Sequence, residues 1–290
     1  DFIVLPKNLE IGANIRKIGE EVSLDSKLLS RGEMLDEYDL AILASQGIAY
    51  TKVLESLKIG VFSGGDELKE PWEFSNAYQI HNSNTTMILA TLRSFGFYGN
   101  YGGILRDKKE LLINTLQKPY DVIFTTGGAS KGEADFMYES LKECGAEILI
   151  NGIQIKPGKP IMVAKLKNKF LIALPGNPLG AAVLLRFLII PFLRQLSGAN
   201  TYYPQYILLK NSNAFKLKSR MNAMLGEIGS SGFYLTQGGK YNSGEILPLT
   251  KSNSIAIFDE HCTEIELGRE IKVLPYPILW SKEKCDIINH

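Results

Sequence analysis

Two glycine-containing turns hold the residue types best suited to bind an anion. The first runs from Thr125 to Asp135 and the second from Leu174 to Pro178; each follows a short apolar run and precedes a helix-like segment. A glycine-rich turn between a buried strand and a helix presents free backbone N–H groups to an anion and lets the ligand approach the main chain. We therefore predict a phosphate-bearing ligand at the C-terminal edge of a parallel sheet. The alternative is that both segments are only tight turns.

Charged side chains near these turns favour the ligand interpretation. Lys131 and Asp135 lie in the first turn, and Lys156 and Lys159 lie between the two turns in the sequence. Lysine ammonium groups donate hydrogen bonds to oxyanions, and the prolines that follow both later lysines restrict the backbone of their loop. The sequence thus predicts a basic, rigid loop close to the two glycine turns.

The composition is that of an ordinary globular protein with a sizeable core. Of 290 residues, 45% are hydrophobic and 22% are charged, and the formal net charge is +1. This charge gives no electrostatic reason to expect nucleic acid or a membrane as a partner. The widely spaced cysteines lack metal-ligand spacing and indicate a reducing, cytoplasmic compartment. The apolar run 181–196 is short and carries charges and a proline, so we expect a buried helix and not a membrane span.

Alternating apolar runs and amphipathic segments predict an α/β domain in the middle of the chain. Such alternation is typical of a mostly parallel sheet with helices on both faces. The predicted strands are 49–54, 59–62, 98–105, 121–124, 147–150, 161–166 and 170–174, and the predicted helices are 38–47, 84–95, 108–117, 134–144 and 178–196. Asn82 or Asn84 is the expected N-cap of the second helix, and Asn177 that of the last, with Pro178 at its favoured first position.

Beyond residue 200 the pattern changes to short alternating runs separated by turn residues. These runs are 202–209, 215–225, 232–236, 254–258 and 270–274. Short strands at this spacing predict a small all-β module, either a barrel or a sandwich.

Short motifs spread over nearly the whole chain resemble those of one known family. They are Gly12-Ala13-Asn14-Ile15-Arg16 with Gly19-Glu20-Glu21, Ser63-Gly64-Gly65-Asp66-Glu67-Leu68, Asn82-Ser83-Asn84, Arg106-Asp107-Lys108, the glycine turn from Thr125 to Asp135, Ile155-Lys156-Pro157-Gly158-Lys159-Pro160 and Leu174-Pro175-Gly176-Asn177-Pro178. In this order and spacing they resemble the MoeA family of molybdopterin molybdenumtransferases, which includes the E domain of gephyrin. Each motif alone is weak, whereas the ordered set is specific.

The resemblance implies a domain organisation. It implies a partial N-terminal MoeA domain (1–54), a MogA-like molybdopterin-binding α/β domain (55–200), a C-terminal β-barrel (203–278) and a tail (279–290). It also implies a homodimer with the active site near the dimer interface, and a MogA-type adenylyltransferase as a further partner. The chain starts without Met or signal peptide and lacks the family's upstream part, so we expect it to begin inside a longer product. Ile15, Leu40, Ile42 and Leu43 are expected to be buried against the α/β domain, the upstream part or a second chain.

The resemblance also implies a reaction and its residues. The family enzyme, a Mg²⁺-dependent transferase, joins molybdate to adenylylated molybdopterin and releases AMP and the molybdenum cofactor. Carried over by motif, the implied catalytic residues are Glu67, Asp107, Asp135 and Lys156, with Glu67 and Asp107 as Mg²⁺ ligands. The implied ligand-binding residues are Gly127, Gly128, Ser130, Lys159, Pro175, Asn177, Pro178, Arg220 and Ser243.

The acidic residues suit this chemistry on their own account. Glu67, Asp107 and Asp135 each follow a predicted strand, so in a parallel sheet all of them can project from one edge. Mg²⁺ binds through one or two carboxylates together with substrate phosphates. Each residue also has a simpler interpretation: Glu67 as a solvated loop charge, Asp107 as a helix cap, and Asp135 as a first-turn acid favoured by the helix dipole.

Departures from the family pattern leave other functions open. They are Glu21, Gly64, Asn82, Lys108, Lys131 and Gly152. Those at positions 82, 108 and 131 make the neighbourhood more positive, which weakens metal binding and strengthens anion attraction. One alternative is therefore a divergent paralogue that binds the pterin or acts as a scaffold. Another is a MogA-type molybdopterin adenylyltransferase, against which the segment 12–21 and the C-terminal β module argue.

Overall fold

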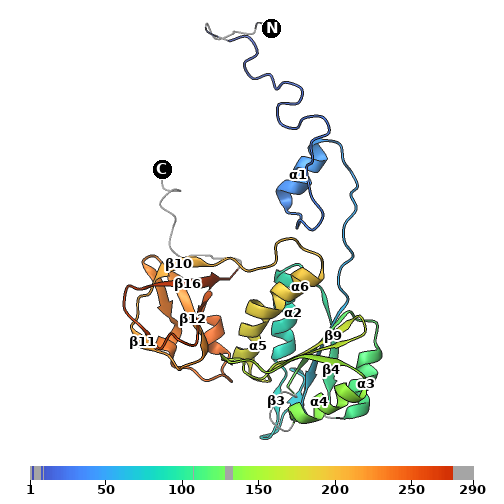
Figure 1. Ribbon diagram of the computed structural model, residues 1–290, viewed down its shortest axis with the longest axis vertical. Coiled ribbons are helices and arrows are strands. Elements are labelled where there is room, and N and C mark those ends of the chain that lie inside the picture. Colours follow the sequence, from blue (N-terminus) through green and yellow to red (C-terminus); the bar gives the residue numbers. More distant parts are fainter. Residues whose placement is uncertain (1, 3–7, 9, 107, 128–132, 277–290) are drawn as a thin grey trace. The chain divides into compact units, whose positions relative to one another are not determined.

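The chain forms two compact units. The computed structural model describes residues 2, 8, 10–106, 108–127 and 133–276 (Figure 1). One unit comprises residues 1–54 together with 198–201, and the other comprises 55–197 together with 202–290. The second unit holds both the strand–helix alternation and the all-β segment, so its two parts share contacts that are described below.

A six-stranded sheet organises the first half of the second unit. Its strands lie in the order β4-β1-β5-β9-β8-β6. Strands β4, β1, β5 and β9 run parallel, which confirms the predicted mostly parallel sheet, and β8 runs antiparallel to both β9 and β6. The bounds are β1 (Ile59–Gly64), β4 (Gly99–Leu105), β5 (Val122–Thr126), β6 (Glu147–Asn151), β8 (Met162–Leu166) and β9 (Lys169–Leu174).

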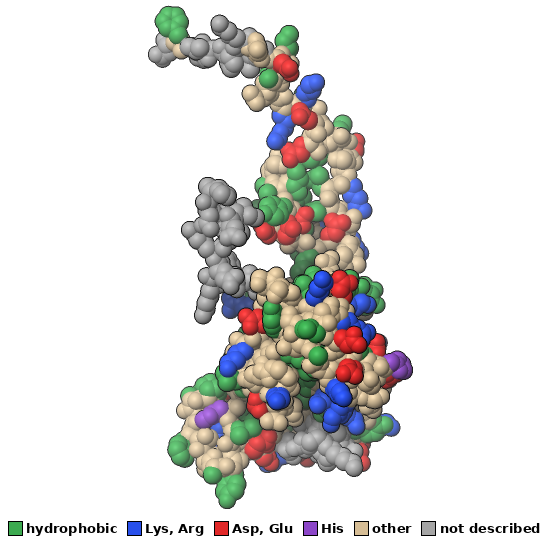
Figure 2. All heavy atoms as spheres, turned by 90° about the vertical axis from the view of Figure 1, so that its left-hand side faces the viewer, with side chains coloured by type: hydrophobic (Ala, Val, Ile, Leu, Met, Phe, Trp, Pro, Cys, Tyr) green, Lys and Arg blue, Asp and Glu red, His purple; other side chains and the backbone are tan. Residues whose placement is uncertain are grey.

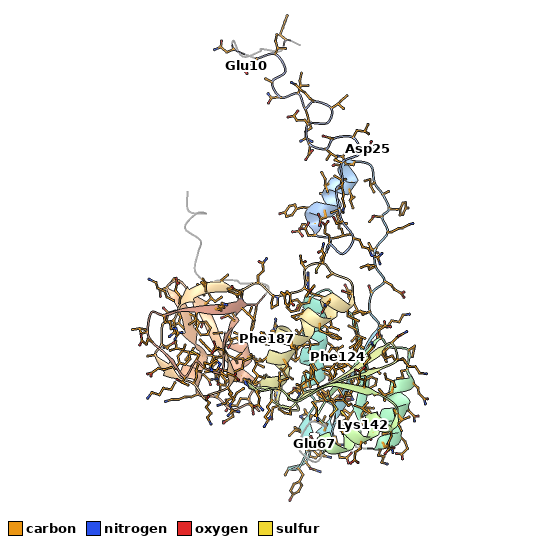
Figure 3. The ribbon with its side chains drawn as sticks, viewed as in Figure 1. Glu10, Asp25, Glu67, Phe124, Lys142 and Phe187 are labelled. Atoms are coloured by element: carbon orange, nitrogen blue, oxygen red, sulfur yellow. The ribbon has the colours of Figure 1, made fainter. Side chains whose placement is uncertain are left out.

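Helices cover both faces of this sheet because its central strands are apolar on both sides. Ile59, Val61 and Phe124 pack towards α2 (Asn84–Ser94) and the long helix that starts at Pro178. Phe62 and Ile123 face the opposite way, towards α3 (Lys109–Gln117) and α4 (Glu133–Glu143). Figures 1 and 3 show this layering, with Phe124 labelled inside the sheet layer.

The long helix is continuous from Pro178 to Leu196. It consists of α5 (Pro178–Leu184), a π-helical segment (Leu185–Ile189) and α6 (Ile190–Leu196). With 19 residues it is long and apolar enough for a membrane span by length and composition, so the expectation that this segment is too short was wrong. Much of the helix is nevertheless buried in the core of the unit, as expected. Asn177 occupies the N-cap position but makes no side-chain capping bond.

The C-terminal part of the second unit is an all-β module. Its main sheet has the strand order β10-β16-β14-β12-β13, and an isolated bridge from Asn211 to Phe233 links the segment after β10 to β13. The bounds are β10 (Ile207–Lys210), β11 (Phe215–Lys216), β12 (Met221–Gly229), β13 (Gly232–Leu235), α7 (Leu247–Thr250), β14 (Ser254–Phe258), β15 (Glu264–Ile265) and β16 (Glu270–Pro275). The predicted strand 215–225 is thus two strands separated by a loop.

Two further contacts tie the β module to the helical layer. Ala223 and Leu225 of β12 belong to the same core cluster as α2 and the long helix. The guanidinium of Arg186, in the π-helical segment, lies 4.3 Å from the ring centroid of Tyr276, just after β16. Burial raises the pKa of Tyr276 to about 12. The partly buried guanidinium therefore faces a neutral aromatic ring, a favourable arrangement.

Several strands of two residues were not predicted from the sequence. The Lys156 loop contains β7 (Ile155–Lys156), which pairs in parallel with β12. The segment after β1 contains β2 (Leu68–Lys69), which pairs in parallel with β3 (Ile80–His81). Strands of two residues are too short to show alternation, which is why the pattern did not predict them. Conversely, the predicted strand 49–54 has no regular secondary structure.

The first unit contains one helix, α1 (Glu37–Ser45), among its described residues. Asp36 caps it by accepting hydrogen bonds from the backbone N–H groups of Tyr38 and Asp39. Leu43 is buried, whereas Ile15 is 68% exposed and Leu40 is 57% exposed, so this chain by itself does not cover these two and their burial by other parts stays a prediction. A unit with one short helix offers too little surface to cover them.

Removing apolar volume under the sheet should destabilise the second unit. Ile88 of α2 is fully buried in the main cluster, so Ile88→Ala should lower the free energy of unfolding by about 2–5 kcal/mol. Arg93→Ala on the exposed side of α2 is the matched control and should change it by less than about 0.5 kcal/mol. Urea unfolding measures both; equal losses would contradict the assigned packing face.

Candidate functional site

Three glycine turns meet at the C-terminal edge of the parallel strands. They follow β1 at Gly64, β5 at Gly127 and β9 at Gly176, and strand register brings them side by side. A Cβ placed on Gly127 would lie 2.4 Å from the carbonyl oxygen of Gly64, and one on Gly176 would lie 3.5 Å from the Cα of Gly127. The turns therefore touch backbone to backbone, a packing that requires glycine at position 127, where φ is +77°.

A network of hydrogen bonds between polar side chains connects β1, β5 and the start of α2 next to these turns. The buried Ser63 hydroxyl donates to Oδ1 of Asn82 at 2.7 Å and lies 3.1 Å from Oγ1 of Thr126. Asn82 donates through Nδ2 to the Tyr101 hydroxyl, which bonds in turn to Glu70. Two causes raise the pKa of Tyr101 to about 12: its burial, which is the larger, and its contact with Glu70. Asn82, a departure from the family pattern, thus holds the start of α2 next to the ends of β1 and β5.

Asn84 joins this network to the turn after β9. Its Nδ2 donates to the carbonyl oxygen of Gly176 at 2.7 Å. Oδ1 of Asn84 and Oγ1 of Thr125 are buried, and neither has a hydrogen-bond partner in the part of the chain that the structure describes. The N-cap of α2 is Ser83, so the prediction of Asn82 or Asn84 at this position was wrong. The Ser83 side chain makes no capping hydrogen bond.

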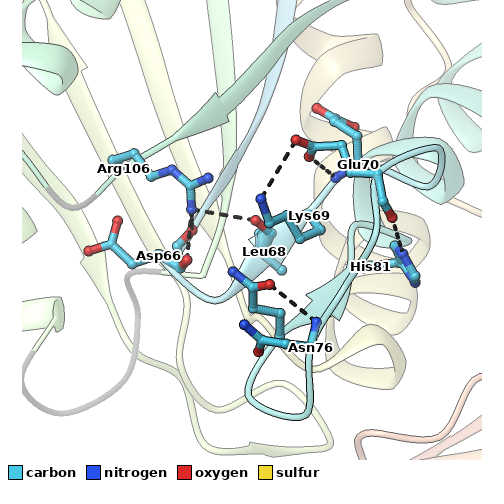
Figure 4. A network of polar contacts seen from close by, with 10 residues as sticks. Asp66, Leu68, Lys69, Glu70, Asn76, His81 and Arg106 are labelled. Atoms are coloured by element: carbon cyan, nitrogen blue, oxygen red, sulfur yellow. Dashed lines mark hydrogen bonds and ion pairs between the residues drawn. The ribbon is translucent and has the colours of Figure 1, made fainter.

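Glu67 lies in the turn that follows β1. The turn is exposed at Asp66 and Glu67, and Arg106 from the end of β4 donates to its carbonyl oxygens (Figure 4). Figure 3 labels Glu67 at the same end of the sheet as the glycine turns. Asp107, its predicted companion, lies outside the described residues, so their proximity stays a prediction.

The structure describes only part of the first glycine turn. Gly127 is described, whereas Gly128, Ser130 and Lys131 lie outside the described residues. Asp135 lies in the first turn of α4, the place that both its catalytic and its dipole interpretation require, but its side chain is not described. The roles proposed for these residues therefore stay predictions.

A cluster of positive charge forms where β7 meets β12. Lys156 pairs in register with Asn222, and the pKa of Lys156 is lowered by burial and by the nearby charges of Lys218 and Arg220. Within the described ranges, none of the three forms an ion pair with a carboxylate. Asn222 fixes the arrangement, because its Nδ2 donates to the carbonyl oxygens of Lys218 and Arg220 at 2.8 and 2.5 Å.

This cluster contains one residue that the sequence did not single out. Lys156 and Arg220 were predicted site residues, whereas Lys218 was not. Its only sequence signal is its place in the basic run Lys216, Lys218 and Arg220. Figure 2 shows both basic and acidic side chains on the face that it draws.

The turn Leu174–Pro178 connects the cationic cluster to the glycine turns. At one end Gly176 contacts Gly127 and Asn84. At the other end the backbone N–H of Leu179 donates to the carbonyl oxygen of Ser243 at 3.2 Å. A Cβ on Gly180 would lie 3.2 Å from the Cα of Gly158, in the lysine-bearing loop, and 3.3 Å from Cγ of Pro175. Ser243, Asn177, Pro175 and the Lys156 loop are therefore neighbours; Lys159 lies exposed on that loop.

Replacing Gly127 should test the contact between the turns. Gly127→Ala adds left-handed backbone strain of about 1–2 kcal/mol and a clash with the Gly64 backbone worth about 1–3 kcal/mol. Gly145→Ala is the matched control, because φ is +76° there and its Cβ would meet nothing within 4 Å. Urea denaturation should show the larger loss for Gly127→Ala, and equal losses would mean that the turns are not in contact.

Comparison with known proteins places this arrangement in a family. Residues 60–195 match the family described as a probable molybdopterin binding domain. The chain is 31% identical over 290 residues to a molybdopterin molybdenumtransferase of Haemophilus influenzae, covering 95% of this chain and 69% of the relative. It is 27% identical over 274 residues to one of Staphylococcus epidermidis, covering 92% of this chain and 65% of the relative.

A solved structure shows the same fold. A molybdopterin biosynthesis MoeA protein from Pyrococcus horikosii superposes with a TM-score of 0.78 at 23% identity, covering 90% of this chain and 65% of that chain. The chain thus spans about two thirds of the length of these proteins. The match to the Haemophilus protein, which extends over nearly the whole chain, decides the assignment: the chain belongs to the molybdopterin molybdenumtransferase family.

Proposed function

We propose that this chain carries out molybdate insertion into adenylylated molybdopterin, with release of AMP and the molybdenum cofactor. The observation that carries the proposal is the cluster of Lys156, Lys218 and Arg220, whose charges repel one another and have no carboxylate partner among the described residues. An oxyanion such as molybdate would relieve this repulsion. The adjoining glycine turns offer the backbone donors that a phosphate group needs.

The two parts of the site divide the work in this proposal. Lys156, Lys218 and Arg220 hold molybdate as donors of charge-assisted hydrogen bonds, with Lys159 and Ser243 beside them. Gly127, Gly128 and Ser130 bind phosphate oxygens of the nucleotide-bearing pterin. The turn with Pro175, Asn177 and Pro178 lies between the two parts and fixes their separation.

Mg²⁺ is the cofactor that we propose for cleavage of the pyrophosphate link. The described residues contain no group of three or more histidine, cysteine or acidic side chains that could hold a metal ion. Mg²⁺ needs only one or two carboxylates from the protein and completes its shell with phosphate oxygens and water. Glu67 and Asp107 are the proposed ligands, and Asp135 is the proposed acid–base residue.

The domain and assembly proposals follow from the family. We keep the division into 1–54, 55–200, a β-barrel at 203–278 and a tail at 279–290, together with a homodimer and a MogA-type adenylyltransferase as partner in the cytoplasm. Exposed apolar side chains in the first unit, among them Ile11, Ile18 and Leu24, support a dimer or a longer chain that covers them.

Measurement of AMP release tests the proposed reaction directly. The protein is incubated with adenylylated molybdopterin, and we expect AMP release only when both molybdate and Mg²⁺ are present. A scaffold would bind the pterin without releasing AMP, and an adenylyltransferase would instead consume ATP on unmodified molybdopterin. Either result would overturn the proposal.

Removal of Lys218 should weaken molybdate binding. We expect Lys218→Met to raise the dissociation constant for molybdate by about tenfold, because one of three converging charges is lost. Lys216→Met is the matched control, since Lys216 is also exposed and lies two residues away in β11. Titration calorimetry with molybdate alone measures both variants; equal effects would remove Lys218 from the site.

The lowered pKa of Lys156 predicts opposite pH trends for binding and stability. The folded chain releases this proton at a lower pH than the unfolded chain, so the contribution to stability rises with pH between the two pKa values. Molybdate affinity should fall over the same range, because Lys156 loses its charge. Lys218→Met raises the pKa of Lys156 and should move the loss of affinity to higher pH. Titration calorimetry at a series of alkaline pH values measures molybdate affinity, and urea unfolding at the same pH values measures stability. Affinity and stability that change in the same direction with pH would contradict the prediction.

A further inference from the structure

One arginine gathers the backbone of the turn that carries Glu67. Nη1 of Arg106 donates to the carbonyl oxygen of Asp66 at 2.7 Å and lies 3.4 Å from those of Gly65 and Leu68 (Figure 4). The carbonyl oxygen of Leu105 accepts from the Gly65 N–H at 3.2 Å. The end of β4 thus holds this turn through both a side chain and the main chain.

The geometry of the turn decides where the Glu67 carboxylate lies. A Cβ on Gly65 would meet the carboxylate atoms of Glu67 at 2.6 to 2.8 Å, so the carboxylate folds back over the glycine. Gly65 has a φ of +136°, which other residues rarely adopt. The carboxylate therefore occupies space that exists only because this position lacks a side chain.

Arg106 does not bind the Glu67 carboxylate itself. Although its charge is opposite, the guanidinium bonds to carbonyl oxygens, and across the described ranges Glu67 forms no ion pair. The turn is also attached through the pairing of β2 with β3, in which the Ile80 N–H donates to the Glu67 carbonyl oxygen at 3.1 Å and the Asn82 N–H donates to that of Lys69 at 2.8 Å. Without Arg106, the backbone of residues 65–67 would depend on these strand hydrogen bonds, which lie at its C-terminal end, and on the bond to Leu105.

We propose that Arg106 is a positioning residue that holds Glu67 for its ligand, acting through the backbone of residues 65–68. The inference rests on the proposed role of Glu67 at the Mg²⁺ site. A flexible turn would have to be ordered each time the ion binds, and that entropic cost would appear as weaker affinity. Prior fixation by Arg106 removes this cost.

Substitutions of Arg106 separate this role from a general structural one. Arg106→Met keeps the aliphatic stem but removes the donor, and Arg106→Lys restores one donor close to the position of Nη1. With Mn²⁺ as the probe and AMP present, we expect Arg106→Met to weaken metal affinity by about tenfold and Arg106→Lys to recover most of it. Arg93→Met, on the exposed face of α2, is the control and should leave affinity unchanged.

Hydrogen exchange reports on the turn without any metal. Exchange of the Ile80 amide, whose acceptor is the Glu67 carbonyl oxygen, should accelerate by tenfold or more in Arg106→Met and not in Arg93→Met. Unchanged exchange in Arg106→Met would overturn the inference, whatever the metal data show.

A double-mutant cycle distinguishes this inference from the proposed function. If Arg106 acts through Glu67, Arg106→Met should cause no further loss of Mn²⁺ affinity in a Glu67→Gln background. Additive losses would overturn the inference. If Glu67→Gln alone has no effect, the proposed metal role of Glu67 fails, and the Ile80 exchange still decides whether Arg106 holds the turn.

Gly65 supplies a second variant in case Arg106→Met folds poorly. Gly65→Ala should displace the carboxylate and weaken Mn²⁺ binding. Gly103→Ala is the matched control, because φ is +94° there and its Cβ would meet nothing within 4 Å. Equal Mn²⁺ affinities of the two variants would show that the placement of the carboxylate does not matter for binding.

Discussion

The close contact of three backbone turns is the constraint on which the site depends. Gly64, Gly127 and Gly176 end neighbouring parallel strands, and a side chain on Gly127 would overlap the Gly64 backbone. Parallel register alone brings strand ends to one edge, but glycine lets the turns touch and keeps their N–H groups close together. The buried Ser63, Asn82 and Thr126 network then fixes the turns to α2.

The second constraint is the joint between the α/β part and the β module. Pairing of β7 with β12 brings Lys156 next to Lys218 and Arg220, and Asn222 holds the backbone of the latter two. A cluster of like charges costs free energy in the absence of an anion. The contact between Arg186 and Tyr276 and the shared hydrophobic core stabilise the joint and offset this cost. Stability elsewhere thus supports the cluster that we propose as the oxyanion site.

Sequence reasoning succeeded where the signal was local. Apolar runs located β1, β5 and β9, and the turn residues after them were correctly placed at one edge of the sheet. It missed Lys218 and β7, because their proximity arises from pairing between segments about 65 residues apart, which no periodicity records. Ile15 and Leu40 are exposed in this chain, so their predicted burial would have to come from the upstream part or a second chain. The motifs named the family, whereas the fold showed which basic residues converge.

The position of a bound oxyanion tests the central claim most directly. Tungstate, a heavier analogue of molybdate, gives an anomalous diffraction signal that locates it in a crystal of this protein. The account predicts one principal site between the side chains of Lys156, Lys218 and Arg220, next to the turn that ends at Pro178. A principal site elsewhere, with this cluster empty, would contradict it.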